Sequence, residues 1–576
     1  MRPMTRGLLF AACLDVAAAL QTACPVRGQQ YLPPTGLSNE PKFKSVAEEL
    51  ADTLERKVEA KLYDGLTFSA SIFSTCSDDL LWQYHHSSKG LKNSTQGAKK
   101  VDADSIYRIG SISKLLTIYL WLLEDGDRHF NVPITDYLPT LTEYAAESSG
   151  LTSTWTDITI GDLAGQMAGL SRDYGLADLA IPNNSLLPVA PAIAKAFSDV
   201  PGGEIPTCGF VYKNGTLAVC TPDEYLKGVA MEAPIFSTAY TPVYSNEAYA
   251  LIGLALEKIT GVPFEASFNK SLVDALGLSS TYYTTPSAVS DQDVIPGRSD
   301  LVGWDGEFGA FAPAGGFYSS SNDFATMGKA ILSNKLLTKA VTDRWFKPTS
   351  FVEDYAQGVG RPWEIFRRKV NGASVEVYVK GGDWGVYHTF FALVPTYDIG
   401  FTVLTADDVG AAVDGLHDPS TGIPNIVIDK VLAAVDDIAK EQALRNFGGH
   451  YADTSSNSSL TLDTDATDTG LLVTSWISNG ADLYEWLGKL QPKLVYRIMP
   501  NQLPAGNDKV AFTSFYWSRA PPVNGTWYWE CPTWIDVDEV TLGNVPLGQM
   551  VFNVGDDGKA TSVEMRALRE TLKRQS

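Results

Sequence analysis

Several common catalytic signatures are missing from this 576-residue sequence. It has no Cys-x-x-Cys pair, no His-Glu-x-x-His stretch, no glycine loop of the kind that cradles phosphates, and no Gly-x-Ser-x-Gly. These absences argue against a zinc enzyme, a P-loop nucleotide enzyme and the α/β-hydrolase class of serine enzymes. The sequence therefore predicts neither a metal nor a cofactor.

Positive charge is also scarce. The chain carries 45 Lys and Arg against 67 Asp and Glu, a formal net charge of −22. That balance argues against nucleic acid and anionic membranes as partners. No uninterrupted apolar stretch reaches the length needed to cross a bilayer, whereas 44% hydrophobic residues suffice for a large buried core.

The first residues have the pattern of a secretory signal peptide. Arg2 and Arg6 precede an apolar run, and small residues follow at positions 17–19. We expect residues 1–19 to be removed and the protein to be secreted to the extracellular space. Asn-x-Ser/Thr acceptor sites fit such a glycoprotein. They are Asn93, Asn183, Asn214, Asn269, Asn457 and Asn524.

Cysteines are few, six in all. Cys208 and Cys220 flank two short alternating runs joined by Asn-Gly, a strong hairpin signal. Because the turn would bring the two strands together, we expect a disulfide between them in an oxidising compartment. The pairing of Cys24, Cys76 and Cys531 stays open.

One stretch combines a polar approach with an apolar helix. Ser111 ends the run Tyr-Arg-Ile-Gly-Ser and Lys114 follows three positions later, on the same helical face. Ser favours a helix start, and a lysine buried by the apolar run could have a pKa low enough to accept the serine proton. Ser-x-x-Lys alone is a weak signal, because Ser267 and Lys270 match it too, in a polar stretch.

Two further motifs follow in order. Tyr244 and Asn246 open a second apolar helical run as Tyr-Ser-Asn, and Lys380-Gly381-Gly382 ends an alternating strand. Each also has a second match around Tyr212–Gly215, but those matches overlap in one turn. They cannot form two walls of a pocket, whereas the first pair can.

Ser-x-x-Lys, Tyr-x-Asn and Lys-x-Gly in this order and wide spacing resemble the serine β-lactamase and penicillin-binding-protein family. Tyr-x-Asn in place of Ser-Asp-Asn resembles the class C branch and its esterase relatives. Connecting segments agree, although Gln166 and Ala168 replace the His and Ser of one family stretch. The resemblance covers roughly residues 40–440.

The resemblance implies a role for each motif. Ser111 would be the nucleophile, and Lys114 and Tyr244 would share the proton transfers. Asn246 would hold Lys114 and the substrate, while Lys380 and Gly382 would line the pocket. Backbone N–H groups of Ser111 and Asp383 would form the oxyanion hole.

One departure bears on the substrate. Gly381 stands where the family usually has a threonine whose hydroxyl helps bind the β-lactam carboxylate. We expect a serine hydrolase acting on a small ester, amide or acyl substrate, with esterase character. Alternatives are an acyltransferase of secondary-metabolite biosynthesis, a true β-lactamase or peptidase, and, in another class, a non-catalytic secreted binding protein.

The pattern of elements gives the fold class. Strands near both ends of residues 40–440 enclose a helical, loop-rich middle, which predicts an α/β antiparallel sheet with covering helices plus an all-helical domain. Residues 441–576 change to Thr, Asp, Gly and Trp with short strand patterns. We predict a separate β-rich domain there, of a kind that accompanies fungal secreted relatives of the family.

Overall fold

The computed structural model describes residues 25–575, apart from 149, 177, 182–204, 214–215, 411–421, 466–468, 491–493, 519–532, 536 and 538–539. The chain divides into two compact units. The larger comprises residues 34–368 and 375–435. The smaller comprises residues 1–33, 369–374 and 436–576. The predicted signal peptide lies outside the described residues.

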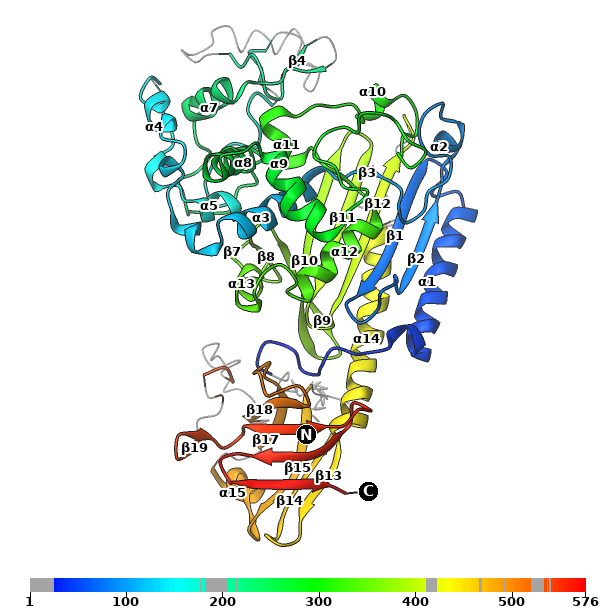
Figure 1. Cartoon of the computed structure of the whole chain (residues 1–576), viewed down its shortest axis with the longest axis vertical. Helices are drawn as coiled ribbons and strands as arrows, with labels where there is room; N and C mark the ends of the chain where they lie inside the picture. The colour runs from blue at the N-terminus through cyan, green and yellow to red at the C-terminus, as the bar shows by residue number, and fades with distance from the viewer. Residues whose placement is uncertain are drawn as a thin grey trace, which may run out of the picture. The chain divides into compact units, whose positions relative to one another are not determined.

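An eight-stranded sheet is the centre of the larger unit (Figure 1). Neighbouring strands pair antiparallel in β2-β1-β12-β11-β10 and in β9-β8-β7, as in Leu66↔Asp407 between β1 and β12. Strand order across the sheet is β2-β1-β12-β11-β10-β9-β8-β7. Their bounds are β1 Leu66–Ser74, β2 Trp82–His86, β7 Ser350–Phe351, β8 Gln357–Val359, β9 Glu364–Val370, β10 Ala373–Trp384, β11 Tyr387–Val394 and β12 Ile399–Asp407.

Helices cover both faces of this sheet, so β1 and β12 are buried along their whole length. Helix α12 (Ser321–Leu332) lies on one face, where an added Cβ on Gly328 would come within 2.3 Å of the Phe73 ring. Phe68 points to the opposite face and stacks on Tyr84. That face carries α1 (Pro41–Glu59), whose Ala47 carbonyl accepts from Trp82.

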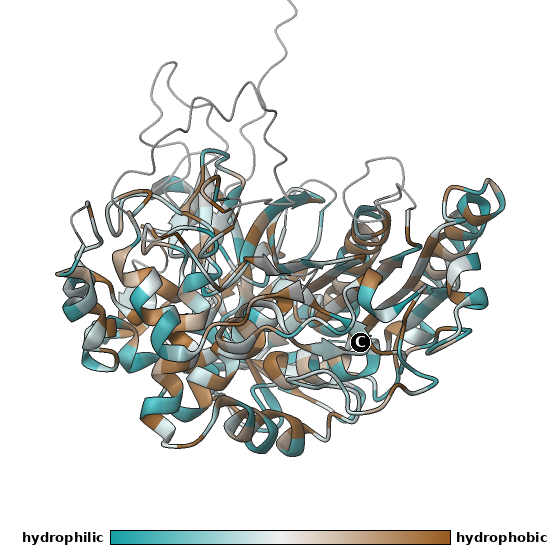
Figure 2. Cartoon of the chain, turned by 90° about the horizontal axis from the view of Figure 1, so that it is seen from above, coloured by the Kyte–Doolittle hydropathy of each residue, from teal (hydrophilic) through white to brown (hydrophobic). Residues whose placement is uncertain are grey.

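Between β2 and β7, the two edge strands of the sheet, the chain forms a group of helices and loops. Figure 2 shows brown and teal on different sides of several helices, as amphipathic helices do. Their bounds are α2 Lys89–Asn93, α3 Ser113–Glu124, α4 Thr140–Ala145, α5 Ile160–Ala164, α7 Pro222–Met231, α8 Glu247–Thr260, α9 Phe264–Phe268, α10 Ser299–Val302, α11 Ala312–Gly315 and α13 Lys339–Trp345. The core of this region includes the buried α3 and α8.

Helix α14 (Ile423–Phe447) contributes to both units, to the larger through Val435 and to the smaller from Asp436. In the smaller unit a sheet closes on itself, because β14 pairs with β13 and also with β15. Trp476 is fully buried in its core. The strands are β13 Gly449–Asp453, β14 Ser458–Asp463, β15 Leu471–Ser478, β16 Ala481–Asp482, β17 Leu494–Pro500, β18 Lys509–Ser518, β21 Met550–Val554, β22 Ala560–Met565 and β23 Glu570–Arg574, with helix α15 Leu483–Leu490.

The predicted fold class is confirmed: a mixed helix and antiparallel-sheet body is followed by a C-terminal β barrel. Residues 387–394 are rich in aromatic and β-branched side chains, which predicts a strand, and β11 has those bounds. The Trp-rich residues 525–529, which also predict a strand, lie outside the described residues.

Candidate active site

Ser111 lies in a 3₁₀ turn, Gly110–Ile112 (η2), and α3 begins two residues later. It is therefore close to the helix start, as expected, but does not cap it. Gly110 takes a positive φ of 48°, which bends the chain ahead of Ser111. The Ser113 hydroxyl donates to the Gly110 carbonyl at 2.7 Å. The Ser111 hydroxyl is left for other partners.

Lys114 is one of those partners. Its Nζ donates to Ser111 Oγ at 3.0 Å, to the Ala314 carbonyl at 2.6 Å, and to Asn246 Oδ1. The side chain is fully buried in α3. Burial lowers the pKa of its ammonium group, and the nearby Lys380 cation lowers it further.

Tyr244 is the second partner, and its hydroxyl donates to Ser111 Oγ at 2.6 Å. The Lys114 and Lys380 ammonium groups lie 5.0 and 5.3 Å from the centre of its ring. Burial raises the pKa of the phenol, but these two cations outweigh burial and the net shift is downward. Residues of the three motifs, which are separated in sequence, thus meet around Tyr244.

Asn246 precedes α8 but its side chain does not cap that helix. Its Oδ1 accepts from Lys114, and its Nδ2 donates to Asp173 Oδ1 at 2.7 Å. Asp173 is buried, and burial raises the pKa of its carboxyl group to about 6, although the Asn246 bond opposes the shift. Asp173 was not identified from sequence, because no motif surrounds it.

Gln166 supports the turn that carries Tyr244. Its Oε1 accepts from the Ser245 backbone N–H at 2.7 Å, and its own carbonyl accepts from Val243 N at 2.8 Å. This residue replaces the histidine of the resembling family stretch. The glutamine supplies a hydrogen-bond acceptor at the base of the Tyr-Ser-Asn turn. The departure from the family stretch at this position was the signal in the sequence.

Lys380 lies on β10 and is buried. Its Nζ donates to Glu364 Oε1 at 2.5 Å, and Gly381 N donates to Glu364 Oε2 at 3.2 Å. Burial alone would lower the pKa of Lys380, but Glu364 and Tyr244 hold it above its usual value. Glu364, on the neighbouring strand, was not identified from sequence.

Gly382 and Gly110 allow two backbone segments to touch. An added Cβ on Gly382 would lie 2.1 Å from the Ile109 carbonyl and 2.8 Å from Ser111 N, and one on Gly110 would lie 2.5 Å from Asp383 N. Thr389 Oγ1 lies 2.8 Å from the Ile109 carbonyl and 3.1 Å from the Gly382 carbonyl, so its hydroxyl can donate to either. The β10 backbone at Asp383 therefore lies directly against the Ser111 turn.

The Asp383 side chain is held from β11. His388 Nδ1 lies 2.7 Å from Asp383 Oδ1, and its Nε2 lies 3.5 Å from Asp407 Oδ2. Burial lowers the pKa of His388, but the two carboxylates outweigh it and raise the pKa to about 10. The imidazolium bridges two carboxylates and is not part of a Ser-His pair.

The second matches to the motifs lie elsewhere. Ser267 is buried in α9, whereas Lys270 is exposed. Tyr212 and Lys213 form a two-residue strand, β4 Tyr212–Lys213, paired with β5 Thr216–Leu217. The Asn-Gly turn between these strands lies outside the described residues.

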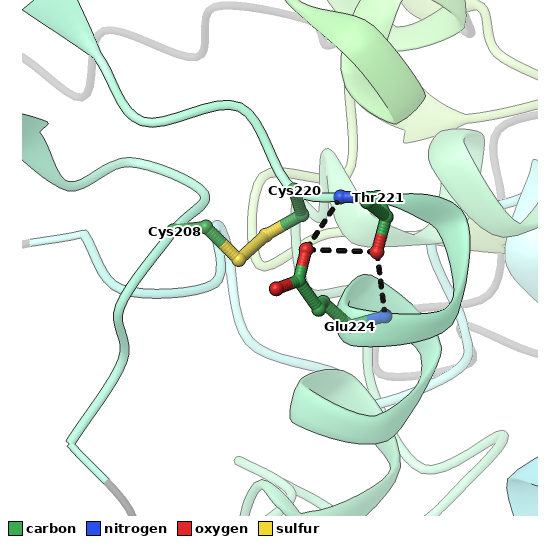
Figure 3. The surroundings of a disulfide bond; sticks show 4 residues. All are labelled: Cys208, Cys220, Thr221 and Glu224. Atoms are coloured by element: carbon green, nitrogen blue, oxygen red, sulfur yellow. Dashed lines mark hydrogen bonds between the residues drawn. A yellow bond between two sulfur atoms is a disulfide. The ribbon is translucent and has the colours of Figure 1, made fainter.

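The predicted disulfide between Cys208 and Cys220 is present. Figure 3 shows that Cys220 is followed at once by a capping box, in which Thr221 and Glu224 bond to each other's side chain and backbone at the start of α7. The covalent link thus ties the loop after Cys208 to a fixed helix end. Cys76 is an exposed free thiol, whereas Cys24 and Cys531 lie outside the described residues.

Of the predicted glycosylation acceptors, Asn93, Asn269 and Asn457 are exposed, and Asn183, Asn214 and Asn524 lie outside the described residues. Among the helices that the structure describes, none has the length and apolarity to cross a membrane. Its described part also holds no cluster of metal-ligating side chains.

Two protein-family models match this chain. The model described as "Beta-lactamase" covers residues 81–421, and "Beta-lactamase-like-like, C-terminal domain" covers residues 439–576. The first range contains Ser111, Lys114, Tyr244, Asn246 and Lys380.

Full-length relatives share the arrangement of both parts. A "Beta-lactamase-like protein" of Arthroderma benhamiae is 27% identical, covering 98% of this chain and 98% of that protein. A "Probable hydrolase M10" of a Phoma species is 24% identical over 98% of this chain and 93% of its own length. A solved class C beta lactamase from Rhodobacter sphaeroides aligns with a TM-score of 0.45 at 16% identity, covering 67% of this chain and 99% of its own.

Proposed function

This chain belongs to the beta-lactamase family, whose domain model matches more than half of it, and we propose that it hydrolyses esters through an acyl-enzyme on Ser111. Hydrolase relatives support the reaction class. The finer proposal concerns the nucleophile, the proton carriers and a preference for small, neutral ester substrates.

One observation carries the proposal: Ser111 Oγ is within hydrogen-bond distance of both Tyr244 OH, at 2.6 Å, and Lys114 Nζ, at 3.0 Å. A serine hydroxyl needs a base to become a nucleophile. A tyrosine with a lowered pKa flanked by two buried cations is suited to that work.

The proton balance is as follows. The Tyr244 phenolate accepts the Ser111 proton as Oγ attacks the carbonyl carbon, and the carbonyl oxygen becomes an oxyanion. Backbone N–H groups of Ser111 and Asp383 stabilise that charge. Tyr244 then returns the proton to the leaving alcohol, and the same steps with water release the acid and restore Ser111.

Lys114 and Lys380 stay charged in this cycle and stabilise the phenolate. Asn246 keeps Lys114 in place through its Oδ1. The missing hydroxyl at Gly381 removes one anchor for an anionic substrate, which favours a neutral ester over a β-lactam with a carboxylate. The strong negative charge of the chain also supports an uncharged small molecule over an acidic polymer.

The test is covalent labelling with a fluorophosphonate, followed by mapping of the modified residue. The proposal requires the adduct on Ser111 and its loss in Ser111→Ala. Ser267→Ala, at the second Ser-x-x-Lys match, is the control and should label like the wild type. An adduct that persists in Ser111→Ala would refute the assignment.

We also propose that the enzyme is a secreted glycoprotein. The Cys208–Cys220 disulfide is compatible with an oxidising compartment, and three acceptor asparagines are exposed. Enzymatic removal of N-glycans from protein made by a eukaryotic host should lower its mass. The shift should shrink in a variant with Asn93, Asn269 and Asn457 changed to Gln, and an unchanged mass in both would contradict the proposal.

A further inference from the structure

A pocket beside Ser111 has a wall of aromatic rings. Its described lining includes Phe210, Phe308, Phe311 and Trp384 together with Asn246 and Asp383. The rings touch one another: Phe308 and Trp384 centroids are 4.4 Å apart, Phe210 and Phe311 5.3 Å, and Phe210 and Trp384 6.4 Å. Such edge-to-face contacts make one continuous apolar surface.

A buried cation, the Arg108 guanidinium, packs against two rings of this wall. The Arg108 guanidinium lies 5.0 Å from the centre of the Phe308 ring and 5.9 Å from that of Trp384. Its Nε donates to the Trp304 carbonyl at 2.9 Å, so the group is fixed by backbone contacts. Arg108 is fully buried. A ligand in the pocket therefore meets the faces of the rings and not the positive charge of Arg108.

The pocket therefore offers few charged side chains to a ligand. Among the described lining residues the one ionisable side chain is Asp383, and His388 pairs with it at 2.7 Å. Lys114 and Lys380, the cations of the site, are buried and do not line this pocket. A negatively charged group gains no ion pair here, whereas a flat apolar group gains contact with four rings.

The proton path decides whether the acyl group or the alcohol group of the ester enters this pocket. Under the proposed function Tyr244 gives its proton to the leaving alcohol, so the alcohol must lie next to the Tyr244 hydroxyl. Tyr244 is absent from the described lining of the aromatic pocket, which Asn246 and Asp383 flank instead. The acyl group therefore points into the pocket.

Phe210 lies in the loop that the Cys208–Cys220 disulfide closes. It follows Cys208 by two positions, and its backbone N–H donates to the Tyr174 carbonyl at 2.9 Å. Gly209 N donates to the Ala218 carbonyl at 2.8 Å on the other arm of the same loop. Cys220 joins that arm to the capped start of α7 (Figure 3).

We infer that this pocket is the acyl-group subsite, that it selects uncharged aromatic acyl groups, and that the Cys208–Cys220 disulfide sets this selectivity by holding Phe210 in the wall. The inference rests on the proposed ester hydrolysis and names its substrate class.

The test compares p-nitrophenyl acetate, benzoate and 4-carboxybenzoate, which share a leaving group. Each kcat/KM is divided by the rate of the same ester with hydroxide, which removes intrinsic reactivity. The wild type should favour benzoate over both other esters. Phe210→Ala and the Cys208→Ser/Cys220→Ser pair should each lower the benzoate-to-acetate ratio about tenfold, the scale of a lost aromatic contact and its buried area.

Phe351→Ala removes an exposed ring outside the pocket and should leave the ratio unchanged. Phenyl and naphthyl acetates, which vary the alcohol, should be affected little by any variant. A ratio unchanged in Phe210→Ala, or a change confined to the alcohol series, would overturn the inference. If the variant with both cysteines replaced fails to fold, the benzoate-to-acetate ratio of Phe210→Ala decides whether the inference holds. Absence of ester turnover and of Ser111 labelling in the wild type would instead overturn the proposed function.

Discussion

Asp173 accepts a hydrogen bond from Asn246 at 2.7 Å, and this contact fixes which end of the Asn246 amide faces Lys114. With Nδ2 directed at the carboxylate, Oδ1 is left to accept from the ammonium group. A rotated amide would direct an N–H at a cation. Asp173 is therefore a positioning residue that acts through Asn246.

Asp173→Asn should weaken this arrangement, because a neutral amide can turn either end toward Asn246. Loss of one hydrogen bond to a charged group predicts a fall in kcat/KM of about tenfold to a hundredfold. The wild type should also lose activity below about pH 6 as Asp173 takes up its proton, and the variant should lack that acid limb. Asp157→Asn, at an exposed site, is the control. Equal pH profiles would show that Asp173 is only structural.

Tyr244→Phe should lower ester turnover by about 10²- to 10⁴-fold, the usual effect of a lost general base. The ring and its contacts with Lys114 and Lys380 remain, so the fold should be preserved. Tyr240→Phe, which alters an exposed tyrosine nearby in sequence, should be close to wild type. Steady-state kinetics with p-nitrophenyl butyrate measures both. Near-normal turnover in Tyr244→Phe would assign the base to Lys114.

His388 should stabilise the fold in a pH-dependent way. Its pKa is about 10 in the folded protein against 6.5 in an unfolded chain, so the folded state holds the proton more tightly. The stabilisation is fully present below pH 6.5 and is lost as pH rises to about 10. Urea unfolding of wild type and His388→Gln should show a stability gap at pH 6 that narrows by pH 9.5. A gap that widens with pH would contradict the bridging role.

Gly381→Thr should raise turnover of a chromogenic cephalosporin. An added Cβ would meet nothing closer than Glu364 Oε2 at 3.7 Å and the Thr389 carbonyl at 3.9 Å, so the β-carbon of the new side chain fits. One restored hydrogen bond to a charged group predicts a gain in kcat/KM of about tenfold to a hundredfold, with little change for p-nitrophenyl butyrate. Gly381→Ala supplies the Cβ without the hydroxyl and should show no gain. The same gain in both variants would exclude the hydroxyl as the cause.

Local patterns in the sequence predicted much of this molecule. Strand-type composition located β11 and apolar helical runs located helices α3 and α8, because a buried element leaves a recognisable run of apolar residues in the sequence. The Asn-Gly pair between two cysteines predicted the disulfide. The order of the motifs predicted that Ser111, Lys114 and Tyr244 share one site, since each has recognisable neighbours in sequence.

The supporting residues were not predictable in the same way. Asp173 and Arg108 act through contacts with segments far away in the chain, and Glu364 acts from a neighbouring strand. An isolated charged residue carries no periodic signal. The aromatic pocket likewise draws rings from three separate segments, around Phe210, Phe308 and Trp384. Even Ser111 differed in detail, because the positive φ of Gly110 is a backbone property that composition does not reveal.

The contact between the Ser111 turn and β10 joins segments far apart in the chain; the Thr389 bond to the Ile109 carbonyl spans 280 positions. A nascent or partly denatured chain has the serine but not the neighbouring strand. Reactivity of Ser111 toward a fluorophosphonate therefore reports whether this long-range assembly is complete. The same reagent would therefore count the correctly assembled molecules in a preparation of the protein.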